Sequence, residues 1–218
     1  MRAVLAALVL GWALVWLPVA RAQPETCPPE CDRIPGSAWP DPWSLPLNPT
    51  HHWPALADLA VPVVAPRFGV EELCASPPVA DARAFAVAAR AVVEQPGGRW
   101  RLQAQIVHWR GETWRGGELA TDVFGAAVAA LRSCQVSAPA VSPSLTTAEP
   151  DRIAAVISGP VIAHLYLLVD PRSSTISELV FTRTGPPAPP APWPAVPDAQ
   201  VLDAMAAPLC AAYLGSCG

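Results

Sequence analysis

The fold is decided by residues 84–109, which read AFAVAARAVVEQPGGRWRLQAQIVHW. Apolar residues alternate with small or polar ones on both sides of Pro96-Gly97-Gly98, and this arrangement is typical of a β-hairpin. The alanine content of residues 82–93 also suits a helix, and of the two we favour the strand. In the second arm, Trp100, Leu102, Ala104, Ile106 and His108 face one way, and Arg101, Gln103, Gln105, Val107 and Trp109 face the other.

A helix, two or three more strands and a last helix are expected after the hairpin. Thr121 caps the first helix, and its apolar face ends at Cys134, which points inward. A Ser/Pro/Thr-rich loop covers residues 135–150, and β-rich runs predict strands at 152–158, 161–169 and 175–182. Asp198 caps the last helix, which Pro208 should kink or split. Its buried stripe is expected to be Val201, Leu202, Met205, Leu209 and Tyr213.

Proline dominates the segment that precedes the hairpin. Ten prolines interrupt any regular element between residues 28 and 66, so residues 23–80 should form an irregular arm. Trp39, Trp43, Trp53 and Phe68 give this arm apolar area that packs onto a core, so we expect it to be ordered. Residues 81–218 then predict an α+β domain, an antiparallel sheet with two helices on one face.

The first 22 residues have the pattern of a secretory signal peptide. Arg2 precedes an uncharged apolar run from Ala3 to Val19, and Ala20-Arg21-Ala22 is a small-x-small cleavage site. An uncleaved anchor is the alternative, but 17 residues are few for a bilayer helix. We therefore expect a secreted or envelope-associated protein without stable membrane insertion after cleavage.

An oxidising destination also gives the cysteines a role. An even number of cysteines behind an export signal predicts disulfides, and the six are Cys27, Cys31, Cys74, Cys134, Cys210 and Cys217. Metal binding is the alternative, but the spacings Cys27-x3-Cys31 and Cys210-x6-Cys217 lack the tightness of zinc ribbons. Six cysteines allow fifteen pairings, so their number alone does not give the connectivity.

The charged residues exclude several functions. Without residues 1–22 the chain carries 12 basic and 18 acidic residues, and this net charge of −6 argues against nucleic acid as a partner. All the basic residues are Arg, so no P-loop lysine exists. The richness in Arg, Ala and Pro is typical of a high-GC genome and suggests an actinobacterium. We find no nucleophile elbow, metal-ligand cluster or cofactor motif.

Three stretches carry a resemblance to a known family. They are Ile106-Val107-His108-Trp109, the segment FGAAVAALRSC at 124–134, and the hairpin from Leu165 to Phe181. Residues 74–213 resemble the extracellular sensor domain of mycobacterial receptor Ser/Thr kinases and related lipoproteins. The resemblance implies an envelope-facing sensor or binder and a disulfide between Cys74 and Cys134. The chain departs from the family in its extra arm and in the lack of a kinase domain, a lipid anchor and a second long-range disulfide. Cys210 and Cys217 are close enough in the sequence to pair locally instead.

The sequence suggests one binding site and three hypotheses for function. Residues 109–117 read WRGETWRGG, and on a flexible loop Trp109, Arg110, Trp114 and Arg115 could stack on a sugar or hold a carboxylate or phosphate. Alternatively, the two indoles anchor the loop while the arginines pair with Glu112 and Glu118. The favoured function is a non-enzymatic domain that binds an envelope component or another protein. The others are a secreted hydrolase using His108 or His164, and a purely structural or antigenic protein.

Overall fold

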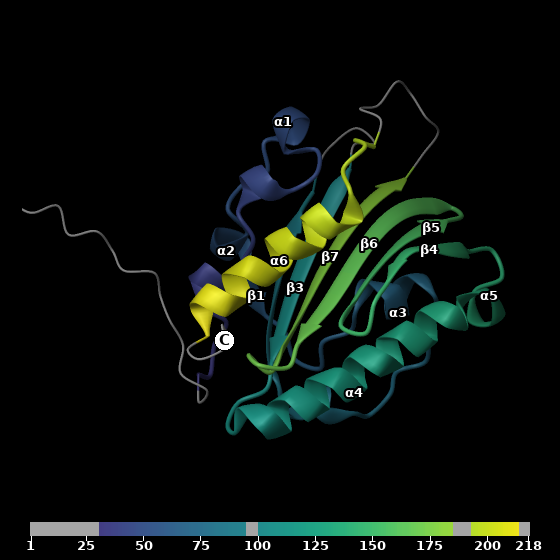
Figure 1. Cartoon of the computed structure of the whole chain (residues 1–218). Helices are drawn as coiled ribbons and strands as arrows, with labels where there is room; N and C mark the ends of the chain where they lie inside the picture. The colour runs from purple at the N-terminus through teal and green to yellow at the C-terminus, as the bar shows by residue number, and fades with distance from the viewer. Residues whose placement is uncertain (1–30, 95–99, 185–192, 214–218) are drawn as a thin grey trace, which may run out of the picture.

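A computed structural model describes residues 31–94, 100–184 and 193–213. Within these residues, seven strands form one antiparallel sheet, and helices pack against it. The strand order is β1-β2-β3-β7-β6-β5-β4, so neighbours in the sequence are mostly neighbours in space (Figure 1). The α+β class and the antiparallel sheet are therefore confirmed. The strands are β1 (Val61–Pro62), β2 (Val87–Val93), β3 (Arg101–His108), β4 (Ser142–Ala148), β5 (Arg152–Ser158), β6 (Val161–Asp170) and β7 (Thr175–Thr184).

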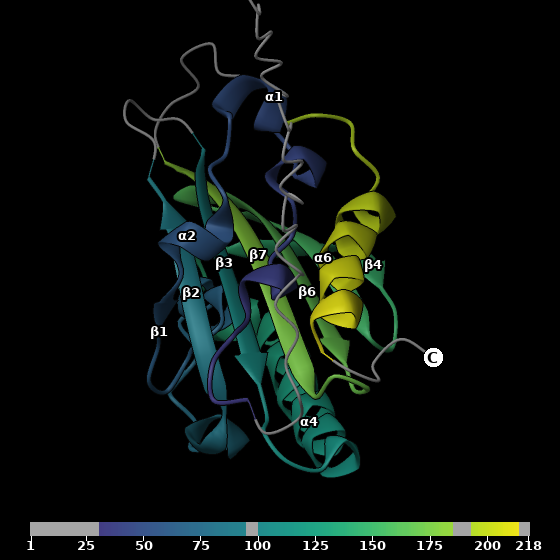
Figure 2. The ribbon, with the colours of Figure 1, turned by 90° about the vertical axis from the view of Figure 1, so that its left-hand side faces the viewer.

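The two long helices cover opposite faces of the sheet, so the expected placement of both on one face is wrong (Figure 1 and Figure 2). On β6, Tyr166 and Leu168 pack with α6 (Asp198–Ala212), while Leu165 and Leu167 pack with α4 (Thr113–Arg132). Successive side chains of a strand point to opposite faces, and a strand that is apolar on both must be covered on both. The continuous apolar run of β6 therefore requires a helix on each side.

The two strands expected from residues 84–109 are present and pair with each other, while the expected turn at Pro96-Gly97-Gly98 lies outside the described residues. Strand β2 pairs with β3 in a register that sets Val87 opposite His108 and Val93 opposite Leu102. The two faces of β3 are also as expected, because Leu102 and Ile106 lie in the core beneath α6 while Val107 lies in the core beneath α4. The segment before β2 is a 3-10 helix, η3 (Ala82–Phe85).

Helix α4 begins eight residues earlier than the expected cap at Thr121. Gly116 and Gly117, which suggested a loop, lie inside the helix against the turn between β6 and β7. A Cβ atom on Gly117 would lie 2.5 Å from the carbonyl oxygen of Pro171. The two glycines therefore serve close packing of the helix on this turn rather than flexibility.

Two further details differ from expectation at the far edge of the sheet. Residues 142–148, expected to be a loop, form the edge strand β4, which pairs with β5 through a bulge between Leu145 and Thr147. Helix α6 runs through Pro208 as one helix and is not split. Asp198 is its first residue and accepts a hydrogen bond of 3.0 Å from Thr147 Oγ1, while Pro197 occupies the cap position. The predicted stripe of α6 is buried as expected.

The described part of the arm, residues 31–80, is folded, but the expectation that it lacks regular elements is wrong, because it contains short helices and a strand of the sheet. Trp39, Trp53 and Phe68 are buried, whereas Trp43 is 80% exposed. The arm supplies β1 to the sheet and packs on both faces. Its other elements are η1 (Gly36–Ala38), η2 (Pro42–Ser44), α1 (Asn48–His51), α2 (Leu56–Leu59) and α3 (Gly69–Leu73).

The disulfide between Cys74 and Cys134 is confirmed, with an S–S distance of 2.05 Å and a Cα–Cα distance of 4.7 Å. It ties the end of α3 to α5 (Cys134–Ser137), the short helix that follows α4. Cys31 and Cys210 are also disulfide-bonded, as expected from the even number of cysteines.

Some of the predictions concern residues outside the described ranges. Cys27 and Cys217, the other two disulfide candidates, lie there, so the predicted local pair of Cys210 with Cys217 stays a prediction. The predicted signal peptide, residues 1–22, lies there as well. Within the described ranges no helix combines the length and the apolar character needed to cross a membrane.

Candidate functional site

The four predicted ligand-binding residues lie around the amino-terminal end of α4, but they do not converge on one point. Trp109 follows β3 and is buried, and its Nε1 donates a hydrogen bond of 2.9 Å to the carbonyl oxygen of Ala82. Trp114 is the second residue of α4 and is 64% exposed. Arg110 and Arg115 are exposed. Trp109 is thus a structural anchor as well as a wall of the site.

Two surface hollows flank the first turn of α4. The smaller, of about 440 Å³, lies against η3 and the loop that leads into α4. The larger, of about 640 Å³, lies against the turn between β6 and β7 and includes Trp114 and Arg172. Three of the four predicted ligand-binding residues therefore line the smaller hollow, and the fourth, Trp114, lines the larger one. Residues that line the smaller hollow include Phe85, Trp109, Arg110, Glu112, Arg115 and Leu119.

The two arginines of the smaller hollow are not used in ion pairs of the described fold. Among the described residues, neither Arg110 nor Arg115 forms an ion pair with Glu112 or Glu118, so the pairing that the alternative interpretation required is not found. Glu112 instead accepts a hydrogen bond of 3.1 Å from Trp114 Nε1. The lining of the smaller hollow carries two guanidiniums and one carboxylate, so its local charge is positive.

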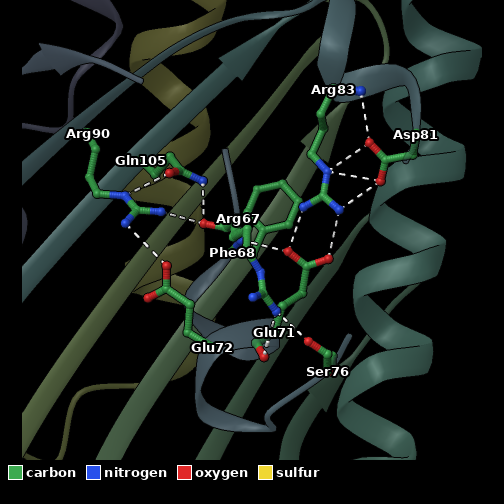
Figure 3. A network of polar contacts seen from close by, with 9 residues as sticks. All are labelled: Arg67, Phe68, Glu71, Glu72, Ser76, Asp81, Arg83, Arg90 and Gln105. Carbon is green, nitrogen blue, oxygen red and sulfur yellow. Dashed lines mark hydrogen bonds and ion pairs between the residues drawn. The ribbon is translucent and has the colours of Figure 1, made fainter. Parts of the chain in front are cut away.

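A buried ion-pair network positions the wall of the smaller hollow (Figure 3). Arg83 of η3 contacts Glu71 of α3 at 2.5 and 2.8 Å and Asp81 at 2.7 Å. Burial disfavours the charged guanidinium, but hydrogen bonds to Glu71 and Asp81 outweigh this effect and raise the pKa of Arg83. The network holds η3 in place, and Phe85 at its end is 76% exposed at the hollow.

The same network continues across the sheet to a fully buried carboxyl group. Arg90 Nε donates to Gln105 Oε1 at 2.8 Å, and Gln105 stands opposite Glu178 in the pairing of β3 with β7. Glu178 is 0% exposed, and its oxygens lie near the N–H groups of Gly69 and Val70 without hydrogen bonds of ordinary geometry. Burial raises the pKa of Glu178 to about 8, which those N–H groups and the Arg90 charge only partly oppose.

Sequence reasoning missed this network. Its members come from α3, η3, β2, β3 and β7, and nothing in the local patterns brings them together. The sequence did contain one signal of this network: Glu178 is the only charged residue in residues 175–182 of β7. A charged residue at an inward-facing strand position requires a partner or a shifted pKa.

The two histidines proposed for a hydrolase lie far from each other, and neither of them lines either hollow. His108 is buried; its Nδ1 lies 3.0 Å from the Ser173 carbonyl oxygen, and its ring stacks on Tyr213 at 4.4 Å. His164 is half-buried and stacks on Trp193 at 3.6 Å, and burial lowers its pKa to about 4.

The sheet register separates these two imidazoles. His108 stands opposite Thr175 and His164 opposite Phe181, six residues further along β7. At about 3.4 Å per residue this is roughly 20 Å. Neither ring lines a hollow at the start of α4. No group of three His, Cys, Asp or Glu side chains suited to a metal ion occurs in the described ranges.

Comparison of the chain with protein-family models gives no match, and the search of curated proteins gives none either.

Proposed function

We propose that this chain is a secreted, extracytoplasmic binding domain that recognises an envelope component at the amino-terminal end of α4. The observation that carries the proposal is the pair of open hollows that flank the first turn of α4, with volumes of about 440 and 640 Å³. Both volumes lie in the range of small-molecule sites. Arg110 and Arg115 are available to a ligand, because the described fold does not use them in ion pairs with Glu112 or Glu118.

The disulfide bonds support the extracytoplasmic setting of the proposal. A bond between Cys74 and Cys134, together with bonded Cys31 and Cys210, is typical of proteins that fold in an oxidising compartment. This agrees with the export signal predicted in residues 1–22. The sensor-like class rests on the resemblance of residues 74–213, which the comparisons leave as a hypothesis.

The geometry favours binding over the two alternatives. A hydrolase would need His108 or His164 in an open pocket next to an acid, and both rings instead pack against aromatic side chains. A purely structural protein has no need of hollows lined by charged groups beside an exposed indole. Binding is therefore the function that these residues support best.

A thermal-shift screen of the purified, oxidised protein tests the proposal. The panel contains neutral oligosaccharides, phosphorylated sugars, carboxylic acids, lipids and divalent metals. A ligand at one hundred times its Kd adds about 2.7 kcal/mol, which raises the midpoint by roughly 5–10 °C in a domain of this size.

The decisive comparison uses matched arginine variants. The proposed site predicts that the thermal shift is lost in Arg110→Ala/Arg115→Ala or in Trp114→Ala. The shift should be kept in Arg132→Ala, at the far end of α4. A ligand whose shift is insensitive to the residues at the start of α4 would contradict the proposed site. A flat panel would contradict small-molecule binding as a whole.

A further inference from the structure

The larger hollow has a chemistry of its own, centred on the Trp114 indole. The polar edge of this ring is satisfied within the protein, because Nε1 donates to Glu112 Oε2 at 3.1 Å. The rest of the indole remains 64% exposed and offers an apolar surface to a ligand rather than to the core.

Hydrogen-bonding groups surround this ring on one side of α4. Glu118, Thr121 and Asp122 lie four, seven and eight residues after Trp114, so they share its face of the helix, and all line the larger hollow. Thr121 Oγ1 donates to the Gly117 carbonyl oxygen at 2.8 Å, which leaves its lone pairs free to accept. Arg172, from the turn between β6 and β7, lines the opposite wall.

This combination matches the chemistry of a sugar ring. A pyranose has an apolar C–H face, which stacks on an indole, and a rim of hydroxyl groups that donate and accept hydrogen bonds. Glu118 and Asp122 accept from hydroxyls, and Arg172 donates to ring or hydroxyl oxygens. The described groups satisfy both the face and the rim of such a ligand.

Charge separates this hollow from its smaller neighbour. Two carboxylates against one guanidinium make the larger hollow locally negative, whereas the smaller one is locally positive. A phosphate or carboxylate is therefore disfavoured beside Trp114. We infer that the hollow between Trp114 and Arg172 binds a neutral oligosaccharide, with one pyranose ring stacked on Trp114. This inference rests on the proposed binding function and specifies its ligand.

Isothermal titration calorimetry with three neutral probes tests the inference: tetra-N-acetylchitotetraose, maltotetraose and mannotetraose. At least one should bind in a saturable manner, and Trp114→Ala should weaken it about tenfold or more. Trp114→Phe, which keeps an aromatic face, should stay within about threefold of the parent. The matched control is Trp43→Ala, which removes an indole of similar exposure from η2. Circular dichroism shows whether each variant is folded.

Three outcomes overturn the inference. One is that none of the three oligosaccharides binds. Another is that Trp43→Ala weakens binding as much as Trp114→Ala, and the third is that Trp114→Phe loses binding as completely as Trp114→Ala. If a phosphorylated sugar binds through Arg110 and Arg115 while the neutral probes do not, the saccharide inference falls and the proposed function stands. If nothing in either experiment binds, both fall.

Discussion

Replacement of Glu178 by glutamine should change how the stability of the protein depends on pH. The native pKa of Glu178 is about 8, against 4.5 for the unperturbed group. Between these values the native state keeps a proton that the unfolded chain has lost. The free energy of unfolding therefore falls as pH rises. From pH 5 to pH 8 the loss amounts to about 3 kcal/mol. A glutamine side chain does not titrate, so the variant should lack this loss.

The assay is guanidinium chloride unfolding, followed by circular dichroism at half-unit steps from about pH 5 to pH 9. The quantity compared is the parent's free energy of unfolding minus that of Glu178→Gln, because other titrating groups cancel in the difference. Glu94→Gln, at a largely exposed carboxylate, is the control and should give a flat difference. A flat difference for Glu178, or one that rises with pH, would refute the reasoning that burial dominates Arg90 and the N–H groups of α3.

Three other predictions test the packing. Gly117→Ala should destabilise the protein by about 1–3 kcal/mol, because the new Cβ atom meets the backbone of Pro171. Gly125→Ala is the matched control in the same helix; its Cβ atom has open space, so it should stabilise the protein by roughly 0.5–1 kcal/mol. Denaturant unfolding of both variants measures these changes. The Cys74→Ala/Cys134→Ala variant should lose about 4 kcal/mol, measured by the same method against its parent, and an unchanged midpoint would contradict a closed 60-residue loop. Arg83→Leu leaves its two carboxylate partners uncompensated and should cost about 3–5 kcal/mol at pH 7; a loss below about 1 kcal/mol would contradict a buried network.

The strands were predictable because each carries its own local signal. Alternation and turn residues located β2, β3, β5, β6 and β7 within a few positions. Strand β4 was missed because its segment, SPSLTTA, is mostly exposed, so no apolar alternation marks it. The start of α4 was missed because Gly116 and Gly117 look like a loop until the turn that they pack against is known. That information lies 54 residues beyond Gly117 along the chain, at Pro171 (171 − 117 = 54).

The candidate site was predictable in position but not in arrangement. The Trp-Arg-Gly duplication pointed to residues 109–115, and those residues do border open hollows. A loop would place both indoles and both guanidiniums together. The helix instead directs Trp114 and Arg115 to different sides of its first turn, because adjacent residues on a helix are about 100° apart. The division into two hollows of opposite charge follows from this geometry.

The central claim is that ligands bind at the amino-terminal end of α4, and indole N–H signals in a two-dimensional ¹H–¹⁵N spectrum test it most directly. Substitution assigns the signals of Trp109, Trp114, Trp43 and Trp193, and any compound that raises the thermal midpoint is then titrated. The account predicts that the Trp114 or Trp109 signal moves in a saturable manner while that of Trp43 stays in place. Movement of Trp43 or Trp193 alone, with Trp109 and Trp114 unchanged, would contradict the claim.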